Sequence, residues 1–358
     1  MIRIGIMTFL HNDNYGSILQ ALALQQALRA LGHDAEDIDY RPSRAEKTRN
    51  LLMSGNSPAL IWEGMRKRKA IAKGSTHQQH ERFLRERLAL SEPCADRAAL
   101  KKAAEKYDVL MCGSDQIWSP VWLNPAYFLD FTDKPRIAYA ASLGVKELPS
   151  PAKKKRMAAL MKPFAAVSVR EREGAALVES LTGFEPVVMP DPVMLRTREQ
   201  WQALAEPPKR QEPYLLCYFI GNQPGYWQQV EALATRLGVS ALVLPRTEAA
   251  YQSGHALAEN VSPEQWLGLL NGAAHIITDS FHGAAFACLF NKSFTVLRRY
   301  REHDPENKNS RVDQLLRMLA LTDTANPDWQ DVNKRLSKER ERALEWLTTS
   351  IDRTQAGR

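Results

Sequence analysis

The stretch from residue 274 to residue 290 constrains the fold of this chain most. The apolar run 274–278 has the length of a short buried strand, and the small apolar residues 284–290 have the pattern of a helix packed under a sheet. Only a tight turn, 279–283, separates them. A strand that turns directly into a helix places the turn at the carboxyl edge of a parallel sheet, where open α/β folds bind their ligands.

The same strand–turn–helix alternation recurs along the chain. Further short strands are predicted at 2–9, 35–40, 107–112, 136–142, 165–170, 186–189, 214–221, 241–244 and 293–297, and the clearest helices at 18–28, 226–237 and 266–271. Strands joined through helices pair in parallel with right-handed crossovers. Because 358 residues exceed a typical single core, the predicted fold is α/β, with two Rossmann-like domains and their parallel sheets facing each other across a cleft.

The composition along the chain suggests where these domains end. The predicted parts are a first domain over 1–200 with a basic helical insertion at about 41–105, a second domain over 212–325, and a terminal amphipathic helix over 329–358. A helix and a linker rich in proline and charge, together covering 197–210, are expected at the boundary. Trp346 and Leu347 lie on the apolar side of the terminal helix, which should therefore pack against a domain.

The chain is basic, with a formal net charge of +7 and a pI near 9.2. Such a charge favours an anionic partner, which is a phosphorylated small molecule, a lipid headgroup surface or nucleic acid. We do not predict nucleic acid, because zinc-finger spacing, an RNA-recognition motif and a clear helix-turn-helix pattern are all missing. The five cations of 65–73 fit an anionic membrane surface, although a solvated helix face is the more frequent outcome of this pattern.

The sequence indicates a protein of the cytoplasm, with peripheral contact at the inner membrane as an alternative. No apolar run approaches the roughly 20 residues that span a bilayer, and the first residues lack the features of a signal peptide. The four cysteines are widely spaced, which fits free thiols in a reducing compartment. No clustered ligands suggest a metal site.

Polar side chains follow several predicted strands, at the edge that faces the cleft. They are Asn14, Tyr15, Gly16 and Gln20 in the first half, then Asp115 and Arg170, and finally Ser280 and His282 in the second half. Each has a simpler explanation, such as a helix cap for Asn14, an Asx turn for Asp115 or an ion pair for Arg170. Their joint occurrence at strand ends favours a functional site instead.

The residue types at these positions suggest an anionic substrate and proton transfer. Arginine forks suit carboxylate and phosphate groups, so Arg170 and Arg311 are candidates, with Arg298 and Arg299 in reserve. His282 stands at a helix start, where free N–H groups favour an anion, and it has no nucleophile motif beside it. Gly-x-Ser-x-Gly, Walker, His-Glu-x-x-His, Cys-x-x-Cys and dinucleotide motifs are missing, which argues against hydrolases, ATPases, zinc enzymes and NAD enzymes.

Four short motifs occur in an order that resembles the polysaccharide pyruvyl transferase family. They are Asn14-Tyr15-Gly16-Ser17-Ile18-Leu19-Gln20-Ala21 with Gln25, then Gly113-Ser114-Asp115-Gln116-Ile117-Trp118, then Ser168-Val169-Arg170-Glu171, and last Asp279-Ser280-Phe281-His282-Gly283. One such string alone would be weak, but together they span about 2–315. The resemblance implies a two-domain fold similar to the GT-B glycosyltransferases.

The resemblance also implies an activity. Members transfer a pyruvyl group from phosphoenolpyruvate to sugar hydroxyls of a cell-surface polysaccharide or its precursor, a glycan or lipid-linked sugar, and form a pyruvate ketal. Carried over by position, Arg170 would hold the donor and His282 would be the acid/base, with Asp191 as a second catalytic candidate. No cofactor is implied beyond phosphoenolpyruvate as the donor substrate.

The last motif carries the remaining substrate-binding candidates, Ser280, Phe281 and Gly283. Some members of the family have arginine where this chain has Ser280, so Arg311 or Arg298 is expected to take its place. Two other functions remain open at this point. One is a glycosyltransferase of the same fold that uses a nucleotide sugar, and the other is a non-enzymatic scaffold of glycan biosynthesis bound to the membrane through 65–73.

Overall fold

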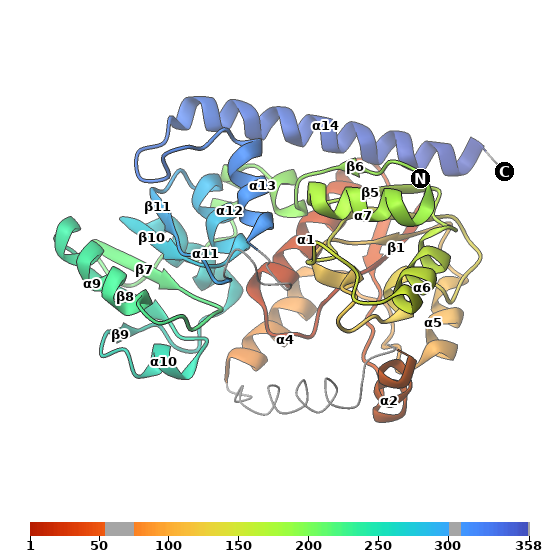
Figure 1. Cartoon of the computed structure of the whole chain (residues 1–358), viewed down its shortest axis with the longest axis horizontal. Coiled ribbons are helices and arrows are strands. Elements are labelled where there is room, and N and C mark those ends of the chain that lie inside the picture. The colour runs from red at the N-terminus through yellow and green to blue at the C-terminus, as the bar shows by residue number, and fades with distance from the viewer. Residues whose placement is uncertain (54–74, 301–308, 357–358) are drawn as a thin grey trace.

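Two parallel β-sheets, each covered by helices, form two lobes (Figure 1). The computed structural model describes residues 1–53, 75–300 and 309–356, so the basic segment 65–73 lies outside the described residues. The first lobe contains the strands β1 (Arg3–Met7), β2 (Asp34–Asp37), β3 (Val109–Cys112), β4 (Arg136–Ala141), β5 (Ala166–Val169) and β6 (Val187–Val188). The second contains β7 (Tyr214–Tyr218), β8 (Ser240–Leu244), β9 (Ala256–Leu257), β10 (His275–Thr278) and β11 (Phe294–Val296).

The strand orders bring the predicted turns after β1, β3 and β5 to one edge of the first sheet. The first sheet has the order β2-β1-β3-β4-β5-β6 and the second the order β11-β10-β7-β8-β9, with parallel pairing throughout both. The carboxyl ends of β1, β3 and β5 therefore share one edge, and β10 is an interior strand of its own sheet, between β11 and β7. The predicted strands are confirmed with somewhat shorter ends, and only β9 was not predicted.

The helices cover the sheets and join the lobes. In the first half they are α1 (Tyr15–Ala30), α2 (Arg44–Met53), α4 (Ser75–Arg87), α5 (Arg97–Ala104), α6 (Pro151–Met161) and α7 (Arg172–Thr182). In the second half they are α8 (Arg198–Gln202), α9 (Tyr226–Leu237), α10 (Glu248–Tyr251), α11 (Pro263–Gly272), α12 (Phe281–Leu289), α13 (Ser310–Met318) and α14 (Trp329–Ala356). Short 3-10 turns lie at Gln116–Trp118, Pro125–Phe128 and Pro192–Leu195.

The helix expected within 197–210 is much shorter than that range. It begins at a capping box of Thr197 and Gln200 but already ends at Gln202. Pro207 and Pro208 follow, and a proline inside a helix removes a backbone hydrogen bond and clashes with the preceding turn. The rest of this stretch therefore leads to β7 without helical structure.

A continuous hydrophobic core joins the two lobes. Ile18, Leu19 and Leu22 of α1 belong to the same buried cluster as Trp266 of α11 and Phe286 of α12. In Figure 1, α1 lies between the two sheets. The first lobe thus uses one face of α1 to pack on the second lobe, and this contact brings the starts of α1 and α12 together.

The terminal helix returns from the second lobe to the first. Leu347, which the sequence places on the apolar side of α14, is fully buried with Ala343 and Ile351 against residues of the first sheet, and Trp346 packs on this cluster. Figure 1 shows α14 running along both lobes. Within the described residues, none of the helices combines the length and the apolar stretch that crossing a bilayer requires.

Candidate active site

The turn after β10 fixes the position of His282. Ser280 caps α12, since its hydroxyl accepts a hydrogen bond from the Gly283 N–H at 3.4 Å. Thr278 at the end of β10 accepts from the Ser280 N–H at 3.1 Å, and its own hydroxyl donates to the Tyr218 carbonyl at 2.6 Å. A side chain at residue 283 would lie 2.5 Å from the Thr278 hydroxyl, so only glycine fits there. Ser280 and Gly283 thus build the turn that presents His282.

The imidazole of His282 lies against the first turn of α1. A Cβ atom on Gly16 would lie 1.9 Å from His282 Nδ1, which leaves no room for any other residue. Asn14 caps α1 by accepting a hydrogen bond from the Gly16 N–H at 3.0 Å. The starts of two helices, one from each lobe, therefore meet at His282, and the partial positive charge of both favours an anion nearby.

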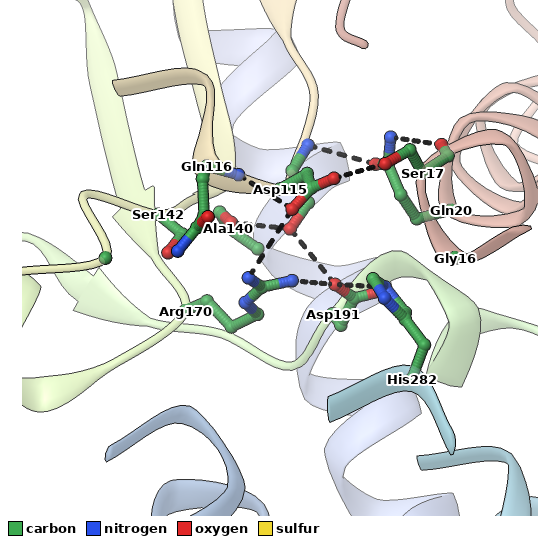
Figure 2. Close-up of polar contacts among 12 residues, drawn as sticks. Gly16, Ser17, Gln20, Asp115, Gln116, Ala140, Ser142, Arg170, Asp191 and His282 are labelled. Carbon is green, nitrogen blue, oxygen red and sulfur yellow. Dashed lines mark hydrogen bonds and ion pairs between the residues drawn. The ribbon is translucent and has the colours of Figure 1, made fainter. Parts of the chain in front are cut away.

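One carboxylate, that of Asp191, joins the key residues of the two lobes (Figure 2). Its Oδ2 atom lies 2.5 Å from Arg170 Nη1 and 3.5 Å from His282 Nε2. The Ser114 hydroxyl donates to the same oxygen at 3.2 Å. Burial raises the pKa of Asp191, but the charge of His282 and then that of Arg170 outweigh it, and the pKa lies below its ordinary value.

Arg170 is surrounded by carboxylates. Besides Asp191, Glu171 lies 3.9 Å from its Nε and Asp115 lies 4.0 Å from its Nη2. Burial lowers the pKa of Arg170, but Asp191, Glu171 and Asp115 more than compensate, and the pKa is raised. Cζ of Arg170 lies 4.5 Å from the centroid of the Phe281 ring. Nε and Nη2 of this buried guanidinium have no hydrogen-bond partner among the described residues, so they remain free for a ligand.

Asp115 has a strained backbone, with φ 72° and ψ −177°. Residues other than glycine rarely adopt such a conformation outside functional sites. The side chain accepts hydrogen bonds from the Gln116 N–H at 2.8 Å and from the Ser17 hydroxyl. Burial raises the pKa of Asp115, but Arg170 and then His282 outweigh it and lower the pKa. Figure 2 shows Asp115 between Arg170 and Ser17.

Arg311 of α13 is the least compensated cation of the site. It is buried, and its Nε has no hydrogen-bond partner in the part of the chain that the structure describes. Burial first, and then the charges of Arg170 and Arg299, lower the pKa of Arg311 to about 10. Arg298, the other candidate to replace the missing arginine, has a side chain that is 56% exposed and pairs with Asp313. Arg311 lines the cavity beside Arg170, whereas Arg298 lines only a smaller neighbouring pocket, of about 10 Å³, that also contains Arg311 and Phe281.

A cavity of about 240 Å³ opens next to these groups. The residues that line it are Arg170, Arg172, Val188, Met189, Pro190, Asp191, Met194, Phe281, Arg311, Gln314, Leu315, Arg317, Met318, Glu339 and Arg342. They come from both lobes and from α14. The buried part of the cavity contains Arg170, Arg311 and Asp191, and the imidazole of His282 lies next to Asp191. These groups can bind a small anion and move a proton to or from it.

Among the predicted site residues, those that line this cavity are Arg170, Asp191, Phe281 and Arg311. The others do not line it, and the polar atoms of Tyr15 and Gln20 are engaged elsewhere. The ring of Tyr15 stacks on Trp266 with centroids 5.4 Å apart, and its hydroxyl donates to the Val261 carbonyl at 2.9 Å. The amide of Gln20 donates to the Thr8 hydroxyl at 2.8 Å and accepts from the Ser114 N–H at 3.1 Å. Their polar atoms are thus used within the protein.

Sequence reasoning missed three residues that hold the predicted ones in place. They are Ser17 on Asp115, Ser114 on Asp191, and Glu171, which accepts from the Ser142 hydroxyl at 2.7 Å and from the Gly144 N–H at 3.3 Å. All three stand within or next to the motifs at strand ends, which was the available signal. Across residues 1–53, 75–300 and 309–356, no group of three or more histidine, cysteine or acidic side chains is arranged to hold a metal ion.

Comparisons with known proteins agree with this architecture. A family model described as polysaccharide pyruvyl transferase matches residues 14–299. No curated protein matches the sequence. Among solved structures, the chain is similar to the UDP-GlcNAc 2-epimerase of Neisseria meningitidis bound to UDP-GlcNAc, with a TM-score of 0.51 and 11% identity over 99% of this chain and 100% of that one.

Two further solved structures show the same likeness. They are the S. aureus MnaA-UDP co-structure, with a TM-score of 0.52 and 11% identity over 98% of this chain and 97% of that one, and the UDP-GlcNAc 2-epimerase of Methanocaldococcus jannaschii, with a TM-score of 0.51 and 12% identity over 97% and 99%. At such identities the likeness shows the fold alone. The fold is of the GT-B type, as predicted, with two parallel sheets in an α/β arrangement.

Proposed function

The chain belongs to the polysaccharide pyruvyl transferase family, and we propose that it transfers a pyruvyl group from phosphoenolpyruvate to two hydroxyls of a sugar. The acceptor is a residue of a cell-surface polysaccharide or of its glycan or lipid-linked precursor, and the product is a pyruvate ketal. The observation that carries the proposal is the buried cavity with two incompletely paired guanidiniums, Arg170 and Arg311, beside the His282–Asp191 pair.

The charges of the cavity suit this donor. Phosphoenolpyruvate has a carboxylate and a phosphate on adjacent atoms, and guanidinium forks bind both groups well. Arg311 forms no ion pair within the described residues, and the charges of Asp115 and Glu171 do not offset the repulsion from Arg170 and Arg299, so an anion beside it would relieve that repulsion. Arg170 is already paired with Asp191, and its free Nε and Nη2 hydrogens are the ones left for the donor.

We assign the proton transfer to His282, which lies beside Asp191. A protonated imidazole donates its proton to the methylene carbon of the donor, which creates an oxocarbenium-like centre at the neighbouring carbon. The first sugar hydroxyl attacks that centre and returns its proton to the imidazole. Phosphate then leaves with the electrons of the C–O bond, the second hydroxyl takes its place, and the proton of that hydroxyl leaves with the phosphate. Asp191 stabilises the imidazolium, and general acid/base help of this kind is worth roughly a hundredfold to ten-thousandfold.

A nucleotide-sugar transferase is the second candidate, because the similar solved structures contain UDP or UDP-GlcNAc. The two candidates differ in the donor that they bind. We expect phosphoenolpyruvate to raise the melting temperature of the wild-type protein, since a ligand at a hundred times its Kd stabilises by about 2.7 kcal/mol. If UDP-sugars raise the melting temperature and phosphoenolpyruvate does not, the result favours a glycosyltransferase that uses a nucleotide sugar.

Variants then test the individual roles. Arg311→Gln should lose the stabilisation by phosphoenolpyruvate, whereas Arg335→Gln, on the exposed face of α14, should keep it. His282→Ala should still bind the donor but should fail to restore the pyruvate mass on surface glycans of a deletion strain, as measured by mass spectrometry. Full restoration by His282→Ala would remove this histidine from the mechanism.

A further inference from the structure

The cavity has a buried end and a partly exposed rim. At the buried end are Arg170, Asp191, Phe281 and Arg311, each of which is less than a tenth exposed. The residues of the rim are Arg172, Gln314, Arg317, Glu339 and Arg342. The proposed donor reaction uses only the buried end, so the rim is available to a second ligand.

The rim gathers three guanidiniums from three different helices. Arg172 is the first residue of α7, Arg317 lies in the last turn of α13, and Arg342 lies on α14. Figure 1 shows these helices on the same side of the molecule. Because α7, α13 and α14 are separate in sequence, only the tertiary structure brings the three charges to one cavity.

The carboxylates at the rim do not balance these charges. Glu339 pairs with Arg342 at 2.5 Å, and Arg342 also donates to the Val188 carbonyl at 2.9 Å, which holds its side chain in place. The carboxylate nearest to Arg317, that of Glu173, is 3.9 Å away, at the limit of an ion pair. Arg172 is exposed and has no ion pair among the described residues. Positive charge therefore remains for a ligand.

Unused hydrogen-bonding atoms continue from the buried end to the rim. The buried guanidiniums of Arg170 and Arg311 have free N–H groups, and Oε1 of Gln314 has no hydrogen-bond partner within the described parts of the chain. Met189, Met194 and Leu315 form an apolar wall of the same cavity. Such a wall suits the C–H face of a sugar ring, while guanidinium forks suit phosphate oxygens.

We propose that the rim formed by Arg172, Arg317 and Arg342 binds the diphosphate of the acceptor. The acceptor is then a sugar diphosphate ester and not a neutral glycan. This inference rests on the proposed pyruvyl transfer, because it assigns the second substrate of the same cavity. A nucleoside diphosphate sugar and a lipid diphosphate sugar share this chemistry.

Inorganic diphosphate is the probe that tests the rim. With saturating phosphoenolpyruvate present, calorimetric titration should show diphosphate binding to the wild-type protein. The double variant Arg172→Gln/Arg317→Gln should bind diphosphate at least tenfold more weakly but should keep its stabilisation by phosphoenolpyruvate, which shows that it is folded. Arg353→Gln, an exposed change about three helical turns beyond Arg342 on α14, should bind diphosphate like the wild type.

Three results would overturn the inference. They are no diphosphate binding, binding that phosphoenolpyruvate abolishes, and binding that the double variant leaves unchanged. Tighter binding of UDP than of diphosphate would support a nucleoside source, and tighter binding of geranyl diphosphate a lipid source. If phosphoenolpyruvate itself fails to bind, the proposed function fails, yet the same titration without it still reports on the rim, so the two failures are distinguishable.

Discussion

Gly16 is the residue on which the geometry of His282 depends most directly. Its missing side chain allows the first turn of α1 to contact the imidazole that α12 presents. We expect Gly16→Ala to reduce kcat at least a hundredfold, because the added methyl group must displace His282 and general acid/base catalysis is worth about that much. Turnover measured at saturating donor checks this.

Gly174→Ala is the matched control for that substitution. Gly174 also lies in a helix, α7, but a Cβ atom there would meet its nearest neighbour at 3.4 Å, an ordinary van der Waals distance. The control should fold and turn over like the wild type. Equal activity of Gly16→Ala and Gly174→Ala would mean that the contact with Gly16 does not position the histidine.

The buried carboxylate of Asp191 predicts how stability depends on pH. Its folded-state pKa lies below the ordinary value of 3.8, so its contribution to stability is present above that value and is lost as the pH falls through the folded pKa. We expect Asp191→Asn to cost about 3 kcal/mol near neutral pH, because Arg170 then loses its closest counter-charge.

The difference between wild type and Asp191→Asn should shrink below about pH 4. There the carboxylate of the unfolded chain begins to protonate, while that of the folded protein stays ionised to lower pH. Urea unfolding from about pH 7 to about pH 2 measures it. A difference that stays constant over this range would show that the charge of Asp191 does not stabilise the folded state.

At the scale of elements, the capped starts of the helices position the turns that carry the site residues. The turns before α1 and α12 are capped by Asn14 and Ser280, which are the residue types that stop a strand and begin a helix. The sequence therefore predicted these turns well. It named Arg311 as a candidate but left Arg298 open beside it, because the choice depends on how α13 packs on the second lobe.

The packing of the terminal helix α14 predicts how substitutions on its two sides affect the stability of the protein. Leu347 is fully buried between α14 and the first sheet, so Leu347→Ala should destabilise the protein by about 2–5 kcal/mol. Lys338→Ala, on the exposed side of the same helix, should change the stability by less than about 0.5 kcal/mol. Chemical denaturation of both variants measures the difference. Similar small effects would mean that α14 contributes little to the fold.

At the scale of the whole molecule, the core that α1 shares with α11 and α12 couples the lobes. A core this continuous leaves little surface along which one lobe could unfold alone. We therefore expect one cooperative unfolding transition in calorimetry. Trp266→Ala removes a fully buried ring from this core. It should lower the temperature of that single transition and reduce the free energy of unfolding by about 3–5 kcal/mol. Two separate transitions, of which only one responds to the substitution, would contradict the coupling.

The sequence by itself determined the strands, the order of the turns and the place of His282 at a helix start, because periodicity and turn chemistry act over a few residues. Only the tertiary structure decided which polar side chains share the cavity. It engaged the polar atoms of Tyr15 and Gln20 elsewhere, brought Arg311 but not Arg298 to the cavity of Arg170, and made Asp191 the contact between Arg170 and His282. These outcomes depend on contacts between segments far apart in the chain, and the packing of α1, α12 and α13 sets those contacts.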